Sequence, residues 1–220
     1  MIRACIFDLD GTILDTITTI TYYVNYTLQK YGIDAVTEDE CKYFAGNGAK
    51  TLIKRALESK GITDEAVFDK VFPDYVEAYD KDSLYLTTPF PGIQKCLVNL
   101  REKGIKLAVI SNKPDFATKS VVKHFFGDSF DLVFGGIEGV PLKPDPTLAQ
   151  KVVSELSVNP EEVCWVGDTA VDIETAKNLG AGLSIGVLWG FRKKEELISA
   201  GADVIISDVD GIYREVISRG

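Results

Sequence analysis

Carboxylates dominate the residues that could do chemistry in this chain, and the most informative pair lies near the N-terminus. Asp8 and Asp10 follow the apolar run 4–7 directly, and Gly11 comes after them. Alternate residues of a strand point to the same face, so the two carboxylates start from the same side, and glycine lets the backbone turn sharply behind them. Like charges about 4 Å apart repel by roughly 4 kcal/mol at an effective dielectric near 20. The pair therefore needs a shared proton, a cation or a basic partner.

Further polar side chains come directly after apolar segments or just before a predicted helix. They are Ser111, Asn112, Lys143, Asp168 and Asp172. Taken singly, each has an ordinary structural explanation, such as a helix cap or a solvated charge. Ligands of open α/β sheets bind beyond the carboxyl ends of the strands, however, and here several segment ends carry parts of what could be one site. We therefore expect these side chains to meet.

These residue types suit a phosphoryl group bound together with a divalent cation. Ser111 and Asn112 can donate hydrogen bonds to a phosphoryl group, and Lys143 can neutralise its charge. A dianionic phosphate could not enter among several carboxylates unless a divalent cation and a lysine offset the repulsion. The sequence therefore predicts Mg²⁺ as cofactor, with oxygen ligands drawn from the aspartates Asp8, Asp10, Asp168 and Asp172.

The apolar pattern predicts the elements that position this site. Residues 16–84 show only helical spacing, with starts near Ile17, at a Thr37 capping box, after Gly48 and at a Thr63 cap. Beyond residue 85, strands and helices alternate, which predicts a mostly parallel sheet covered on both faces. The expected fold class is α/β: a Rossmann-like doubly wound parallel sheet core (1–15 and 85–220) with an inserted α-helical cap domain (16–84).

Composition and charge indicate which binding partners and which cellular compartment to expect. The net charge of −9 and a pI near 4.7 oppose binding to nucleic acid or to an anionic membrane surface. No apolar run approaches the ~20 residues of a spanning helix, and Met1 leads directly into the first strand without room for a signal peptide. The four cysteines lie far apart, which favours reduced buried thiols in a cytoplasmic protein.

Four motifs in order carry a family resemblance. The segments 8–12 (DLDGT), 111–112 (SN), 143–146 (KPDP) and 167–172 (GDTAVD) resemble the motifs of the haloacid dehalogenase-like superfamily. The helical insert is similar to the cap domain of that superfamily. Within the insert, 45–50 (AGNGAK) followed by 55–57 (RAL) resembles phosphoglycolate phosphatases in particular.

The resemblance implies a division of labour in the site. Asp8 would be the nucleophile that forms an aspartyl-phosphate, and Asp10 would protonate the leaving oxygen and then activate water. Mg²⁺ would be bound by Asp8, the Asp10 carbonyl and Asp168, with Asp172 ligating the metal or orienting its waters. Lys143 would stabilise the phosphoryl oxygens. The remaining phosphate and substrate contacts would come from Gly11, Thr12, Ser111 and Asn112 in the core and from Lys50 and Arg55 in the cap.

The expected function is hydrolysis of a small phosphorylated metabolite, with 2-phosphoglycolate as the leading substrate, by a monomer or homodimer. Several alternatives stay open at this point. A pyrophosphatase or a broad sugar-phosphate phosphatase fits the same motifs. A mutase related to β-phosphoglucomutase would want a cap histidine, which is absent from 16–84, and a dehalogenase would not need Asp10. A phosphonoacetaldehyde hydrolase would need a cap lysine, and a receiver-like phospho-accepting switch or a phosphate-binding module would not turn over.

Four further features have more ordinary interpretations. The segment 208–211 (DVDG) imitates the first motif, but Asp208 is expected to cap a helix. His124 lies mid-helix, which argues against a histidine-based site. Lys113 is expected to have a surface role, although it neighbours Ser111. The segment 189–191 (WGF) follows a strand and could line the entrance to the site.

Overall fold

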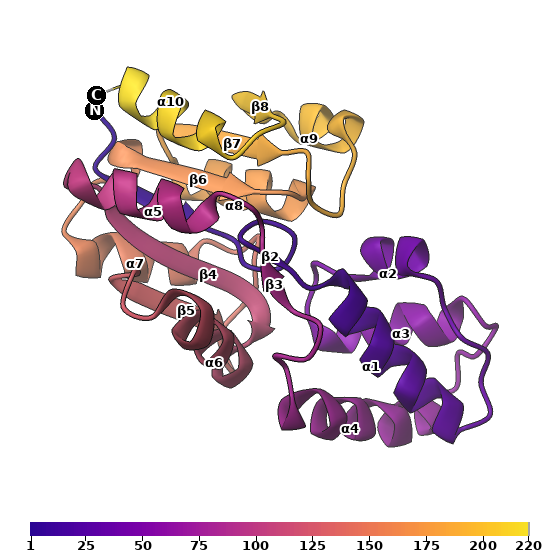
Figure 1. The fold of residues 1–220 in the computed structure, drawn as a ribbon. Helices are drawn as coiled ribbons and strands as arrows, with labels where there is room; N and C mark the ends of the chain where they lie inside the picture. The colour runs from indigo at the N-terminus through magenta and orange to yellow at the C-terminus, as the bar shows by residue number, and fades with distance from the viewer. Residues whose placement is uncertain (220) are drawn as a thin grey trace.

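A parallel six-stranded sheet forms the centre of the larger part of the molecule (Figure 1). The computed structural model describes residues 1–219. In spatial order the strands are β5 (Leu132–Gly136), β4 (Lys106–Pro114), β1 (Ala4–Phe7), β6 (Val163–Gly167), β7 (Leu183–Val187) and β8 (Val204–Ile206), and every pairing is parallel. From β1 the chain fills the sheet first toward β5 and then toward β8. The carboxyl end of β1 therefore lies where the strand order reverses, the usual ligand position in such folds.

Helices cover both faces of this sheet, because alternate residues of each strand face opposite sides. Cys5 and Phe7 of β1 pack with α5 (Ile93–Glu102), α6 (Asp115–Phe126) and α10 (Asp210–Ser218). Ala4 and Ile6 pack with α7 (Thr147–Leu156) and α8 (Ala170–Leu179) on the other side. The 3-10 turn η1 (Pro160–Glu162) precedes β6, and α9 (Lys194–Ala200) lies beside α8. The predicted doubly wound α/β fold is confirmed.

A separate group of helices, here called the four-helix unit, follows β1 in the chain. It comprises α1 (Ile17–Lys30), α2 (Glu38–Phe44), α3 (Ala49–Glu58) and α4 (Glu65–Lys81), which share a hydrophobic cluster of their own. Figure 1 shows the unit on the side toward which the strand arrows point. It is joined to the sheet through an antiparallel ribbon of β2 (Leu14–Asp15) and β3 (Thr88–Pro89).

The structure corrects the sequence-based elements in three places. The N-cap of α4 is Asp64, whose carboxylate accepts the Ala66 N–H, not Thr63. β4 runs through Ser111 to Pro114, because Pro114 still aligns with Gly136 of β5 after an irregularity in the register. The β2/β3 ribbon was not predicted, since two-residue strands leave no periodic signal. Gly220, the last residue of the expected core, lies outside the described residues.

Several predictions are confirmed at the level of single residues. Thr37 and Glu40 form the predicted capping box of α2. The N-cap of α10 is Val209, one residue after the predicted Asp208, although the Asp208 side chain accepts the Gly211 N–H in the first turn. All four cysteines are buried and free of disulfides. Within residues 1–219, no helix combines the length and the apolar character needed to cross a bilayer.

Candidate active site

Three buried carboxylates meet at the carboxyl end of the sheet. Asp8 directly follows β1 and is held there by its N–H, which donates to the Val166 carbonyl of β6. Asp168 follows β6, and Asp172 lies in the first turn of α8. Oxygen atoms of Asp8, Asp168 and Asp172 lie within 4.8 Å of one another. The topology has thus gathered residues 160 positions apart in the chain into one acidic cluster.

Lys143 is the counter-charge of this cluster. Its Nζ donates to Asp8 Oδ1 and to Asp172 Oδ1, both at 2.7 Å, and its side chain is only 3% exposed. Burial opposes the positive charge, but Asp172 and Asp8 outweigh it and raise the pKa of Lys143 above its ordinary value. Lys143 therefore remains an ammonium in the interior.

One ammonium does not balance three carboxylates. Burial, followed by repulsion from Asp172, raises the pKa of Asp8 well above its ordinary value. The same two causes raise the pKa of Asp168 to about 7. A hard divalent cation would relieve this repulsion, and closely spaced carboxylate oxygens are the ligands that Mg²⁺ prefers. The donor set thus fits a divalent metal held by Asp8, Asp168 and Asp172.

Neighbouring residues fix the orientation of Asp168. Its Oδ1 accepts the Thr12 hydroxyl at 3.0 Å, and its Oδ2 accepts the Phe191 N–H at 2.7 Å. Gly11 has φ +84°, and a Cβ there would lie 2.5 Å from Asp168 Oδ2. A Cβ on Gly190 would lie 2.3 Å from the Asp168 Cβ. Gly11 and Thr12 therefore support the acidic cluster, and the tight packing requires glycine on both sides of Asp168.

The second carboxylate of the first motif, Asp10, has a lysine of its own. Lys113 Nζ lies 3.2 Å from Asp10 Oδ1 and also donates to the hydroxyl of Tyr79 from α4. The surface role expected for Lys113 is wrong, because the residue is only 8% exposed. The extension of β4 is the reason: it carries Lys113 inward toward Asp10. The two aspartates thus end in separate ion pairs.

Asn112 and Ser111 organise the loops around the site. The Asn112 amide nitrogen donates to the carbonyls of Gly46 and Lys143, and its oxygen accepts the Lys143 N–H at 2.8 Å. Asn112 therefore ties Lys143 and the loop before α3 to the end of β4. The Ser111 hydroxyl oxygen accepts the Lys113 N–H and keeps its own proton for a ligand.

A cavity of about 70 Å³, the volume open to the centre of a water-sized sphere, lies between the sheet and the four-helix unit. Asp8, Asp10, Ser111 and Asn112 line its core side. Of the segment 189–191, only Phe191 is among the described residues that line the cavity, and it also belongs to the hydrophobic cluster of the four-helix unit. The opposite wall comes from the four-helix unit and includes Ile20, Gly46, Gly48, Ala49, Leu52, Tyr75 and Tyr79. The nucleophilic and acid–base candidates thus face the same small cavity.

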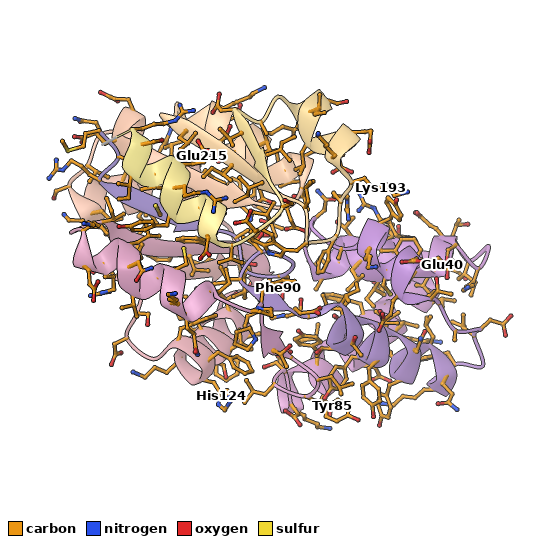
Figure 2. The ribbon with its side chains drawn as sticks, turned by 45° about the horizontal axis from the view of Figure 1, so that its top comes forward. Glu40, Tyr85, Phe90, His124, Lys193 and Glu215 are labelled. Atoms are coloured by element: carbon orange, nitrogen blue, oxygen red, sulfur yellow. The ribbon has the colours of Figure 1, made fainter. Side chains whose placement is uncertain are left out.

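Other predicted residues lie away from this cavity. Lys50 lies over the Phe72 ring, and the Arg55 guanidinium donates to the carbonyls of Tyr43 and Phe44. Neither is among the described residues that line the cavity. Figure 2 shows His124 at the outer edge of the molecule, away from Phe90 at the junction with the four-helix unit.

Arg192 is a contact that sequence reasoning missed. It follows β7, its side chain is 8% exposed, and it donates to the carbonyls of Lys42 and Ala45 in the four-helix unit. Its Nε also pairs with Glu196 at 3.2 Å. A lone arginine in a loop carries no periodic signal, so only the folded structure reveals that it connects the two parts.

Comparisons with known proteins agree with this geometry. A family model described as haloacid dehalogenase-like hydrolase matches residues 5–185. The phosphoglycolate phosphatase of Aquifex aeolicus is 34% identical over 87% of each chain, and that of Vibrio cholerae is 30% identical over 98% of this chain and 97% of the other. The crystal structure of a candidate phosphoglycolate phosphatase from Lactobacillus delbrueckii subsp. bulgaricus is 33% identical and superposes with a TM-score of 0.93 over 97% of this chain and 98% of that one. The protein belongs to the haloacid dehalogenase-like hydrolase family.

Proposed function

We propose that this enzyme is a Mg²⁺-dependent phosphatase that hydrolyses small phosphate monoesters through an aspartyl-phosphate on Asp8, with 2-phosphoglycolate as its leading substrate. The observation that carries the proposal is the arrangement of the first motif. Asp8 and Asp10 both line the cavity, and each is paired with its own buried lysine, Lys143 and Lys113. The choice of substrate is supported by relatives named phosphoglycolate phosphatase.

In the first half-reaction the Asp8 carboxylate would attack phosphorus while the bond from phosphorus to the ester oxygen breaks. Asp10 would donate its proton to the departing oxygen, so that an alcohol leaves rather than an alkoxide. Lys143 contacts Asp8 and would offset the negative charge of the phosphoryl oxygens. The product of this step is an acyl phosphate on Asp8.

In the second half-reaction Asp10, now a carboxylate, would take a proton from water as the water oxygen attacks phosphorus. The bond between phosphorus and the Asp8 oxygen breaks, inorganic phosphate leaves, and the proton on Asp10 is restored for the next cycle. Lys113 lies 3.2 Å from Asp10 and would hold this carboxylate against the cavity in both steps. When bound by Asp8, Asp168 and Asp172, Mg²⁺ would supply positive charge that lets a phosphate dianion approach these carboxylates.

The four-helix unit would act as a cap over the cavity. It supplies one wall of the cavity, and Tyr79 of α4 contacts Lys113 beside Asp10. Such a wall would exclude bulk water while the ester is cleaved and would limit the size of the alcohol group. We propose residues 16–84 as this cap and residues 1–15 and 85–220 as the catalytic core.

The test is phosphate release from 2-phosphoglycolate, other monoesters and pyrophosphate, with Mg²⁺ and again with EDTA. We expect release that requires Mg²⁺ and is fastest with 2-phosphoglycolate. Asp8→Asn should abolish turnover because an amide cannot accept the phosphoryl group, while the circular dichroism spectrum is unchanged. Asp128→Asn, an exposed carboxylate paired with Lys123, is the matched control and should keep full activity.

Each alternative predicts a different result. Turnover by Asp8→Asn would refute the nucleophile assignment. Preference for pyrophosphate or for sugar phosphates would keep the mechanism and replace the substrate. A phosphate that stays on Asp8 for many minutes without release would instead make this protein a phospho-accepting switch.

A further inference from the structure

One lysine side chain in the wall of the cavity, Lys113, has only a supporting role in the proposed hydrolysis. Among the described residues that line it, Lys113 is the only lysine or arginine, and three lining residues are acidic, Asp8, Asp10 and Asp80. A Mg²⁺ ion and Lys143 would offset the charge at Asp8. Any further negative charge on a substrate would need a separate positive partner on the other side of the phosphate.

Lys113 has hydrogen-bonding capacity left for a ligand. An ammonium carries three N–H donors. Lys113 Nζ lies 3.2 Å from Asp10 Oδ1 and 3.5 Å from Asp10 Oδ2, an arrangement in which the two oxygens share one N–H. A second N–H goes to the Tyr79 hydroxyl, and the Lys113 side chain is 5% exposed. One donor therefore remains at the wall of the cavity, where a charged hydrogen bond is shielded from bulk water.

Tyr79 adds a second donor from the four-helix unit. Its hydroxyl oxygen accepts from Lys113, so its own proton is free to be donated. Burial, followed by the charge of Asp10, raises the pKa of Tyr79 well above its ordinary value, which keeps that proton in place. Lys113 and Tyr79 thus place one ammonium donor and one hydroxyl donor together, a pattern that suits the two oxygens of a carboxylate.

The position of Lys113 and Tyr79 beside Asp10 determines which part of a substrate the two side chains can contact. Asp10 is the group that would protonate the ester oxygen, and Lys113 lies 3.2 Å from it. In a two-carbon acid ester, the carboxylate follows the ester oxygen after a single methylene. A substrate whose ester oxygen reaches Asp10 would therefore bring such a carboxylate to Lys113 and Tyr79. The wall beyond is formed by Gly46, Gly48 and Ala49 at the start of α3, whose helix dipole also favours an anion there.

We infer that Lys113 and Tyr79 form the subsite that recognises the carboxylate of a short phosphorylated acid. This inference rests on the proposed phosphatase function and deepens it, because it names the residues that would distinguish a carboxylated ester from a neutral one. It also moves this role away from Lys50 and Arg55, which do not line the cavity. The subsite joins the two parts of the molecule, since Lys113 comes from β4 and Tyr79 from α4, and the two side chains already touch in this structure.

The experiment compares 2-phosphoglycolate with ethyl phosphate, which has the same two-carbon skeleton without the carboxylate. Lys113→Met should lower the ratio of their kcat/KM values by roughly 10- to 100-fold, the usual effect of losing a hydrogen bond to a charged group. Tyr79→Phe should lower it by roughly 3- to 10-fold for the same reason. Lys113→Arg should restore much of the preference. Any loss of Asp10 positioning affects both esters and cancels in the ratio.

Controls separate this inference from the proposed function. Lys54→Met, an exposed cap lysine paired with Glu65, should leave the ratio unchanged, and Arg55→Ala tests the candidate from the sequence. Calorimetric binding of both esters to Asp8→Asn, with and without Lys113→Met, gives a readout without turnover. An unchanged ratio and unchanged binding in Lys113→Met would overturn the inference even if hydrolysis itself is normal. If the wild-type enzyme releases no phosphate, the proposed function fails, and the binding data alone decide about Lys113.

Discussion

At the scale of single residues, the main feature is a buried cluster whose charges do not cancel. Lys143 neutralises part of the charge of Asp8 and Asp172. Burial first, and then the remaining repulsion from Asp172, raises the pKa values of Asp8 and Asp168. Such a cluster lowers the free energy of unfolding, and proteins commonly retain such strain where it serves binding or catalysis. A phosphate site is one place where an excess of carboxylates becomes useful once a divalent cation binds.

Replacing Lys143 should show how much of the fold depends on this counter-charge. Lys143→Met leaves Asp8 and Asp172 buried without their cation, so we expect a loss of about 3–5 kcal/mol in the free energy of unfolding. Urea denaturation in EDTA measures the change. Lys119→Met removes an exposed pair with Asp115 and should cost no more than about 0.5 kcal/mol. Equal effects of the two substitutions would contradict a special role for the buried pair.

The affinity for Mg²⁺ should depend on pH because protons compete for the same oxygens. Asp168 has a pKa of about 7 in the folded, metal-free protein, above its ordinary value of 3.8. The folded state therefore holds a proton that the unfolded state has already lost, so metal-free stability falls as pH rises from about 4 to about 7. Mg²⁺ must displace this proton, and its apparent Kd should decrease by up to about tenfold per pH unit in that range.

Calorimetric titration with Mg²⁺ at several pH values below and above neutrality measures this dependence. Affinity should rise toward neutrality and level off above it. Asp168→Asn should weaken binding and flatten the profile, whereas Asp128→Asn should change neither. A wild-type affinity that stays constant across the range would refute the proton competition.

At the scale of elements, polar side chains connect the catalytic strands to the four-helix unit. Asn112 at the end of β4 donates to the Gly46 carbonyl, and Arg192 after β7 donates to the carbonyls of Lys42 and Ala45. All three carbonyls lie around the end of α2 and the loop before α3. These contacts set the position of that loop, which forms part of the cavity wall.

Removing Arg192 should loosen this connection while the ion pairs of Asp8 with Lys143 and of Asp10 with Lys113 stay in place. We expect Arg192→Met to lower the free energy of unfolding by about 1.5–3 kcal/mol and to raise KM more than it lowers kcat. Urea denaturation and steady-state kinetics measure the two effects. Arg214→Met is the matched control, because Arg214 forms only an exposed pair with Asp208. A KM equal to that of the control would mean that the loop keeps its place without Arg192.

At the scale of the whole molecule, the four-helix unit and the sheet have separate hydrophobic clusters. The hydrophobic cluster of the four-helix unit includes, among its buried described residues, only two from outside 16–84, namely Ala117 and Phe191. The connection otherwise consists of the β2/β3 ribbon and polar contacts. Little apolar surface must therefore be exposed for the unit to swing away from the sheet, and such motion would admit substrate and release product.

Hydrogen exchange should show that the four-helix unit opens more easily than the sheet. Amides of β1, β4 and β6, which are central and buried, should exchange only through global unfolding. Amides of α1 to α4 should exchange through openings of lower free energy, and bound Mg²⁺ with inorganic phosphate should slow them. Native-state exchange followed by mass spectrometry makes the comparison. Equal protection of the two parts would show that they open as one unit.

The sequence by itself determined the fold class and most of the acidic cluster. Local pattern predicted the helix start near Ile17 and the Thr37 capping box, because each depends on neighbours in the chain. The order of the motifs placed Asp8, Lys143, Asp168 and Asp172 at the ends of elements. A parallel sheet then brings such ends to one edge, so this part of the site follows from local pattern and topology.

Only the tertiary structure decided how the remaining charges are partnered. Lys113 looked like a surface lysine until the irregular pairing of β4 with β5 carried it inward to Asp10 and Tyr79. The Arg55 guanidinium donates to two carbonyls of its own unit, contacts that the pattern of residues 55–57 does not reveal. The physical reason is that an ion pair or hydrogen bond depends on the three-dimensional position of both partners, and residues 34 to 103 positions apart leave no shared pattern in the chain.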